Sequence, residues 1–246
     1  MKKLIFILTA IIATASFLGA DVHIKSKTHT DAFEMMGQVQ PAKDELTEQW
    51  IGNNIFATFS SKQNMVIDLN KNMMYVIYPQ DKSYVEAQLP LDLSKLLPPE
   101  AAQMLSMFQV TAKVTPTDET KKVGDWNSTG YDMEMNFTGM MSMTMNLKIW
   151  ASTEVHFDWK TYMEEMYPAV LKVSSISMPL TDDIVNEFKK IKGFQVASEM
   201  TMNIMGANMR VTTEVIEIAE KPAPAETYSV PAGFTKKDTL SLQRDF

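Results

Sequence analysis

Methionine is the side chain that gives this sequence its chemical character. It makes up 21 of the 246 residues, and its thioether can ligate a soft metal ion or line an adaptable apolar surface. Two clusters, at positions 133–145 and 200–209, carry Met at many alternate residues. This spacing places the side chains on one face of a strand. The candidate binding set is Met133, Met135, Phe137, Met141, Met143, Met145, Met200 and Met202.

Three interpretations of this methionine face are open. The side chains can fill an ordinary packed core, they can form the deformable wall of an apolar cavity, or their sulfurs can ligate Cu(I). Neighbouring methionines on one strand face stand ~7 Å apart, so a copper ion would need sulfurs from different strands. No Cys occurs in the chain, and no His lies near these clusters. We therefore rank copper last.

Residues that usually carry catalysis do not form a recognisable pattern. The sequence contains no Gly-x-Ser-x-Gly, His-Glu-x-x-His, phosphate-loop or dinucleotide motif. His23 and His29 share a strand face about 20 Å apart, which is too far to ligate one ion. The acid pairs Glu164–Glu165 and Asp182–Asp183 are adjacent on predicted helices and do not face each other. We expect no catalytic residues, no metal site, no cofactor and no enzymatic activity.

The first twenty residues have the layout of a secretory signal. Lys2 and Lys3 precede an apolar run over 4–12, and small residues follow up to Ala20. We expect a signal peptide at 1–20 that directs export to the periplasm, with cleavage before Ser16 or Asp21. A lipoprotein is not expected, because no Cys is present to carry the lipid.

Charge and composition exclude some classes of binding partner. The formal net charge is −7, and removal of Lys2 and Lys3 makes it more negative. A negative protein is a poor partner for nucleic acid or for an anionic membrane surface. After the signal, no apolar run reaches the ~18 residues of a membrane span. The absence of Cys suits an oxidising compartment.

Alternating apolar and polar residues predict a large antiparallel sheet. Three short strands with polar turns are expected over 65–89, and Met73–Tyr78 should be covered on both faces because it is apolar throughout. Two long hairpins are expected over 131–149 and 194–218, with Asp132 and Glu134 facing away from the methionines. Further strands are expected at Asp21–Thr30, Glu48–Ser60, Val110–Val114 and Lys121–Val123, the last two separated by a polar turn.

Three segments are expected to be helical. One begins at Pro98–Glu100, where proline is tolerated in the first turn. Another covers Asp158–Val173 and is interrupted at Pro168. The third runs from Thr181, an N-cap candidate, to Lys190. With about ten or eleven strands and two or three helices, the chain is predicted to form a single α+β domain.

Several short motifs occur in a recognisable order along the chain. They are Trp50-Ile51-Gly52, the strands over 65–86, Val114-Thr115-Pro116-Thr117, Gly130-Tyr131, Ile149-Trp150 and Val230–Phe234. This order resembles an uncharacterised family of exported bacterial proteins, which is in turn similar to the outer-membrane lipoprotein carrier (LolA/LolB-like) superfamily.

The resemblance covers most of residues 21–237, and it leaves 238–246 as a C-terminal tail. It implies a strongly curved open antiparallel half-barrel wrapped around the helices, with an apolar cavity between them that holds acyl chains in the carriers. The chain has only two arginines, Arg210 and Arg244, and neither is recognisable as a buried residue that gates the cavity.

The leading hypothesis is a periplasmic, non-enzymatic protein that binds a lipid or another apolar ligand, as a carrier or chaperone does. The first alternative is a ligand-free structural or interaction protein of the cell envelope. The second is a methionine-rich copper-binding protein. The expected partners are an apolar small molecule and, transiently, envelope proteins or the outer membrane, with no nucleic acid.

Overall fold

The structure is a computed structural model that describes residues 20–35, 37–139, 142–174, 180–204 and 206–240. Nearly all of the predicted signal peptide, the candidate residue Met141 and most of the predicted tail lie outside the described residues.

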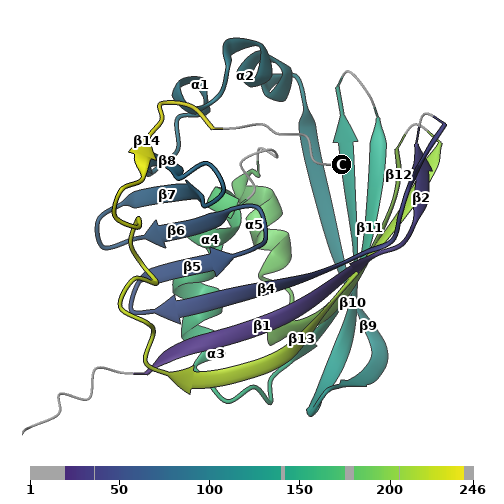
Figure 1. The fold of residues 1–246 in the computed structure, drawn as a ribbon. Helices are drawn as coiled ribbons and strands as arrows, with labels where there is room; N and C mark the ends of the chain where they lie inside the picture. Colours follow the sequence, from purple (N-terminus) through teal and green to yellow (C-terminus); the bar gives the residue numbers. More distant parts are fainter. Residues whose placement is uncertain (1–19, 36, 140–141, 175–179, 205, 241–246) are drawn as a thin grey trace, which may run out of the picture.

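A strongly curved, open sheet of twelve strands dominates the described chain (Figure 1). The strand order is β14-β8-β7-β6-β5-β4-β1-β13-β12-β11-β10-β9, and all neighbours are antiparallel except the short edge pair β14 and β8. A separate hairpin joins β2 and β3. The predicted α+β class with an open, curved antiparallel sheet in one domain is confirmed, with slightly more strands than expected.

The strands of the first half of the chain are β1 (Asp21–Thr30), β2 (Phe33–Met35), β3 (Gln38–Gln40), β4 (Lys43–Gly52), β5 (Ile55–Phe59), β6 (Asn64–Asp68), β7 (Met73–Tyr78) and β8 (Ser83–Gln88). Those of the second half are β9 (Gln109–Val123), β10 (Trp126–Thr138), β11 (Met143–Ser152), β12 (Phe194–Ile204), β13 (Ala207–Lys221) and β14 (Thr235–Lys236). Strands β9–β13 form one half of the sheet and β4–β8 form the other, with β1 between them, and β5–β8 are the shorter strands (Figure 1).

The helices lie on the concave side of the sheet or at its rim (Figure 1). Those at the rim are α1 (Leu93–Leu96) and α2 (Pro99–Ser106). On the concave side, α3 (Trp159–Thr161), η1 (Tyr162–Met166) and α4 (Tyr167–Ser174) form one continuous helix. It is followed by α5 (Asp182–Phe188). None of the described helices is long and apolar enough to cross a membrane.

The long helix passes through Pro168, where the sequence predicted an interruption. Proline lacks the N–H that an α-helix needs and clashes with the carbonyl one turn earlier. The turn before it is a π-turn, in which the Tyr167 N–H donates to the Tyr162 carbonyl. This wider turn accommodates Pro168, so the irregularity changes the local geometry without ending the helix.

Strand β9 also differs from its prediction. The expected polar turn between 114 and 121 is absent, and β9 continues through Pro116 for fifteen residues. Proline is tolerated because β9 is an edge strand, where one side of the backbone needs no partner. A shift in pairing opposite Gly130 absorbs the extra residues.

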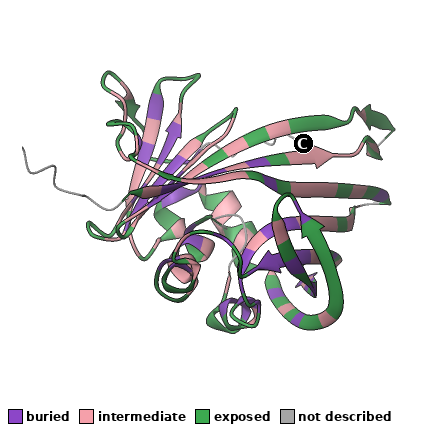
Figure 2. Ribbon diagram, turned by 90° about the horizontal axis from the view of Figure 1, so that it is seen from below, coloured by how far each residue is buried: buried purple, intermediate pink, exposed green. Residues whose placement is uncertain are grey.

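Apolar side chains pack in three layers. The first lies between the concave face of the sheet and the long helix, and the second lies between β9–β12 and α5. The third lies on the convex face of β4–β8, where the segment 222–234 covers Trp50, Val66 and Ile77. Strand β7 is therefore covered on both faces, as its composition predicted. Figure 2 shows buried residues gathered in the strands near the helices, and exposed residues at the outer loops.

Candidate functional site

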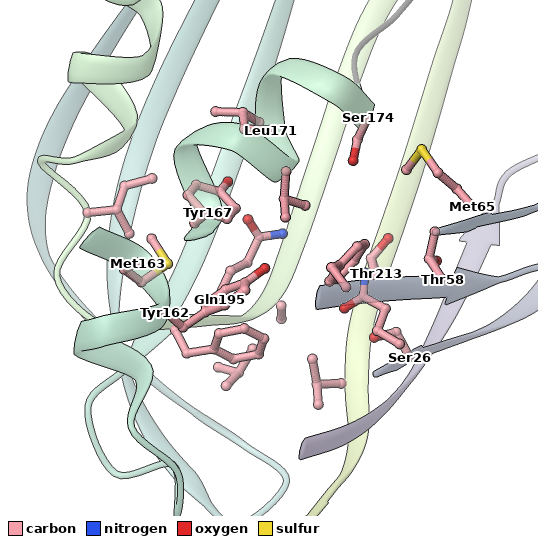
Figure 3. Close-up of a pocket in the computed structure, with 18 of the residues that line it drawn as sticks. Ser26, Thr58, Met65, Tyr162, Met163, Tyr167, Leu171, Ser174, Gln195 and Thr213 are labelled. Carbon is pink, nitrogen blue, oxygen red and sulfur yellow. The ribbon is translucent and has the colours of Figure 1, made fainter. Parts of the chain in front are cut away.

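A cavity of about 470 Å³ lies between the long helix and the concave face of the sheet (Figure 3). This volume is within the ~300–1,000 Å³ range of small-molecule sites. The exposed residues Gln63 and Ser174 on its wall mark where it meets solvent. The wall consists of Ser26, Gln49, Phe56, Thr58, Ser60, Gln63, Met65, Tyr162, Met163, Tyr167, Val170, Leu171, Ser174, Ile191, Gly193, Phe194, Gln195, Val196, Ala197, Thr213 and Val215.

Aromatic packing fixes the helical side of the cavity. The Tyr162 ring centroid lies 6.1 Å from that of Phe194 on β12 and 5.9 Å from that of Tyr167. Tyr167 in turn lies 6.3 Å from Phe188 on α5. Such tilted and edge contacts are favourable arrangements for aromatic rings. They hold both tyrosines against the sheet, where they line the cavity together.

A bulge in β12 shapes the opposite wall. Trp150 of β11 pairs with Ala197 and Ala151 pairs with Gln195, so Val196 is an extra residue on β12. Strict alternation would turn every second residue of β12 away from the concave side, whereas four consecutive residues, Phe194 to Ala197, line the cavity. The bulge therefore explains how the half-buried Gln195 reaches the cavity beside its apolar neighbours.

Gly193, just before β12, must be a glycine. Its φ is +113°, and a Cβ there would lie 2.6 Å from the Ser152 carbonyl oxygen. Only glycine adopts such a backbone conformation without steric cost. This close approach brings the start of β12 tightly against β11 and sets the position of Phe194 and Gln195.

Inward-facing positions change from apolar to polar along several strands. On β1 the inward residues Val22 and Ile24 are followed by Ser26, and on β5 Phe56 is followed by Thr58. On β13 Val215 neighbours the inward Thr213, whose hydroxyl lies 3.0 Å from that of Thr28. One part of the cavity wall is therefore apolar, and the other part is polar.

The described wall of the cavity carries no charge. None of its residues is Asp, Glu, Lys, Arg or His, and its polar groups are the hydroxyls and amides of Ser, Thr, Gln and Tyr. Burial raises the pKa of Tyr162 and of Tyr167 above the ordinary value, because the phenolate would be poorly solvated. Both phenols therefore stay neutral hydrogen-bond donors at physiological pH.

The structure places the predicted methionine face beside this cavity, on a different part of the sheet. Met133, Met135, Phe137 and Met145 are buried, and Met143, Met200 and Met202 pack partly buried against them. Asp132 and Glu134 are exposed, as are Ser142 and Thr144 on the neighbouring strand, so the predicted faces of Met133, Met135, Asp132 and Glu134 are confirmed. None of the described members of the candidate set lines the cavity.

Register brings the methionines into one row across four strands. Met135 pairs with Met145, Met145 with Met202, and Met202 with Met209. The face they belong to packs against Ile184 and Phe188 of α5. This arrangement corresponds to the packed-core interpretation at this position, while the copper interpretation stays a prediction.

The candidate histidines and one of the acid pairs make pairwise contacts, with His23 buried and His29 half-buried. The Nε2 atom of His23 lies 3.0 Å from Glu48, and the Nδ1 atom of His29 lies 2.8 Å from Asp44. Asp182 contacts Lys172 at the start of α5. Among the described residues, no group of three or more His, Asp and Glu is arranged to hold a metal ion.

A second hollow of about 740 Å³ lies at the other end of the long helix, beside Ala20. Its wall includes the carboxylates of Asp21, Asp158, Glu165 and Glu220. An apolar ligand would gain little from such a wall, because the carboxylates must stay hydrated. The neutral cavity between helix and sheet is therefore the better candidate site.

Sequence reasoning missed the residues that line this cavity. The methionine clusters drew the prediction to the long hairpins, whereas the cavity is lined by single polar residues at inward positions of otherwise apolar strands. Such positions can be found in the sequence, for example Ser26 after Val22 and Ile24. Their convergence cannot be found there, because it depends on the path of the helix and on the bulge in β12.

Comparisons with known proteins give little further guidance. No family model and no curated protein matches this chain. A solved structure from Vibrio parahaemolyticus, described as an outer membrane lipoprotein-sorting protein domain, aligns with 84% of this chain and 88% of its own, at 6% identity and a TM-score of 0.30. At this TM-score the likeness supports no conclusion about function.

Proposed function

We propose that this protein is a non-enzymatic binding protein of the bacterial envelope, exported to the periplasm, that takes a lipid or another apolar ligand into the cavity between the long helix and the sheet. The observation that carries the proposal is the cavity of about 470 Å³ whose wall includes Phe56, Val170 and Leu171. Removing an apolar ligand from water into such a space is favourable by roughly 25 cal/mol per Å² buried.

The open sheet suits a carrier or chaperone. Entry and release need a wall that can move without unfolding the sheet, and the cavity is closed on one side by a single helix and its flanking segments. Two methionines, Met65 and Met163, lie on the wall, and their flexible side chains adapt to varied apolar shapes.

Binding of the uncharged dye Nile red to delipidated protein tests the proposal. We expect a saturable fluorescence increase and a raised thermal midpoint, because a ligand that binds only the folded state stabilises it. Met163→Trp should weaken binding by about tenfold or more, since the indole fills the cavity. Met104→Trp is the matched control, because Met104 lies on α2, is 36% exposed and does not line the cavity.

Two results would contradict the proposal. One is a delipidated wild-type protein that neither binds Nile red nor changes its thermal midpoint. The other is a folded Met163→Trp variant that binds as tightly as the Met104→Trp control. Either result would favour the ligand-free envelope protein, which the dense packing of the methionine face already favours for that part of the sheet.

A further inference from the structure

Thr213 and Ser60 on the cavity wall have hydrogen-bond partners, but other polar side chains of the wall have none among the described residues. Gln49 and Gln195 are half-buried and Tyr162 is buried, yet none of their side chains bonds another described residue. The same holds for the Tyr167 hydroxyl. Figure 3 shows Gln195, Tyr162 and Tyr167 extending from one side toward the space that Ser26 and Thr213 face from the other.

Such groups need a partner in the occupied cavity. Nearly all buried polar atoms in proteins are hydrogen-bonded, and each one left unpaired is costly. Water can satisfy them when the cavity is empty of ligand. A purely aliphatic occupant would displace that water and leave amides and phenols unpaired. The occupant that fits therefore has polar atoms of its own as well as an apolar part.

The positions of the charged residues on the strands further restrict which polar groups the ligand can have. The charged residues that directly flank the cavity-lining positions of β1 and β4 are on the convex face, and Lys43 and Glu45, which share the face of Gln49 further along β4, do not line the cavity. On β4, Glu48 faces outward and lies 3.0 Å from His23, while the next residue, Gln49, lines the cavity. On β1, Lys25 and Lys27 pair with carboxylates on the convex face on either side of the inward Ser26.

A charged head group would find no counter-ion on this wall. Transfer of an ion out of water is costly unless an opposite charge or several hydrogen bonds compensate it. Neutral groups such as hydroxyls, esters and amides match the donors and acceptors present. A glutamine amide both donates and accepts, so it can bind either kind of neutral group.

We propose, building on the proposed function, that the ligand of this cavity is an uncharged amphiphile. Its aliphatic part packs against the apolar wall at Phe56, Val170 and Leu171. Its hydroxyl, ester or amide groups bond with the glutamine and tyrosine side chains, chiefly Gln195 and Tyr162. Fatty-acid anions and cationic amphiphiles are selected against, because the wall offers them no partner of opposite charge.

A series of twelve-carbon ligands with different head groups tests this proposal on the wild-type protein. Each ligand competes with Nile red at about pH 8, where a carboxylic acid is ionised. The series is monolaurin (neutral and polar), laurate (anionic), dodecyltrimethylammonium (cationic) and dodecane (no head group). We expect monolaurin to bind about tenfold or more tighter than the other three, since each hydrogen bond is worth about two- to tenfold in affinity.

Gln195→Leu tests the named residue, because leucine has a similar size and lacks the amide. The variant should bind monolaurin about two- to tenfold more weakly and bind dodecane as well as the wild type does. Gln103→Leu on the exposed side of α2 is the control and should leave the series unchanged. The ligand series on the wild type decides the proposal even if Gln195→Leu does not fold.

The outcomes separate this inference from the proposed function. If Nile red does not bind, the proposed function fails, and this inference fails with it. If Nile red binds but laurate or dodecyltrimethylammonium competes as well as monolaurin, the ligand site stands and the neutral-amphiphile inference is overturned. Equal competition by dodecane and monolaurin would also overturn it, because the polar groups would then play no part.

Discussion

Methionine occupies two different environments in this protein. Met133 and Met135 are packed among Ile149, Ile184 and Phe188, whereas Met65 and Met163 line the cavity. The side chain is the same, and only what lies opposite it differs. A packed methionine contributes stability through the contacts of every atom, while one on a cavity wall has atoms with no protein neighbour.

The packed environment predicts a large stability effect at Met133, which is 1% exposed. Met133→Ala should lower the free energy of unfolding by about 2–5 kcal/mol, because it leaves a cavity that the surrounding side chains fill only in part. Met107→Ala is the matched control, since Met107 is 45% exposed, and its cost should stay within ~0.5 kcal/mol. Chemical denaturation measures both, and equal losses in the two variants would contradict the assignment of Met133 to a packed core.

Residue types and spacing were enough to predict which way the methionines point. A period of two fixes the face of each residue on a strand, and Met133, Met135 and Met145 are on the expected side. The same pattern cannot distinguish a packed core from a cavity wall. That depends on α5 (Asp182–Phe188), which lies far along the chain from these residues, and no local pattern contains that information.

Helix α5 covers the methionine face of the sheet. Its N-cap Thr181 accepts a hydrogen bond from the Ile184 N–H, as the sequence predicted. Near its other end, the Glu187 carboxylate accepts a hydrogen bond of 2.8 Å from the Val114 N–H on the edge strand β9. This bond attaches the helix to the strand and satisfies a backbone donor at an unpaired edge.

Glu187 predicts a pH dependence of stability. Lys190, and then the Val114 N–H, lower the pKa of this carboxyl below its ordinary value of 4.5. A lowered pKa in the folded state means that the contribution is present above about pH 4.5 and is lost as the pH falls through the folded-state pKa. Glu187→Gln should therefore be less stable than the wild type at about pH 7, with the two stability curves converging as the pH falls below 4.5.

The measurement is the free energy of unfolding by urea across this pH range. Glu164→Gln is the control, because Glu164 is exposed on η1 and has no hydrogen bond to another described residue, so its curve should follow that of the wild type. Parallel curves for Glu187→Gln and the wild type would show that the carboxylate does not anchor α5 to β9.

Elements were predicted best where one pattern decides them. The hairpins of β6–β8 and β12–β13 and the start of α5 follow from alternation, turns and a cap. Two predictions were wrong: the polar turn between Val114 and Lys121, where β9 continues through Pro116, and the interruption of the helix at Pro168. Pro116 is tolerated because β9 is an edge strand, and Pro168 is tolerated because a π-turn precedes it.

At the scale of the whole molecule, the sheet is covered on both faces in its β4–β8 half. The helices cover the concave face, and the segment that follows β13 crosses the convex face and ends as β14 beside β8 (Figure 1). Further bonds hold its end, including those from the Thr235 N–H to the Lys82 carbonyl and from the Leu240 N–H to the Leu96 carbonyl. The C-terminal segment is therefore part of the folded domain.

Phe234 tests whether this cover stabilises the domain. Its ring packs on the apolar convex face with Trp50 and Ile77, and it is only partly buried. Phe234→Ala should lower the free energy of unfolding by about 1–3 kcal/mol, less than the ~3–5 of a fully buried phenylalanine. For a domain of this size, each kcal/mol lowers the thermal midpoint by about 2–4 °C. Thr235→Ala, at the neighbouring exposed position, should change it little.

Proteolysis gives an independent measure of the same contact. A segment held by fewer apolar contacts detaches more often, and protease cleavage follows the population of the detached form when detachment is fast. Trypsin should therefore cut Phe234→Ala faster than the wild type at Lys236 or Lys237, which follow the segment, while the bond after Lys221 is resistant because Pro222 follows it. If neither the cleavage rate nor the thermal midpoint changes, the segment lies over the sheet without stabilising it, and the convex face of β4–β8 must be stable without its cover.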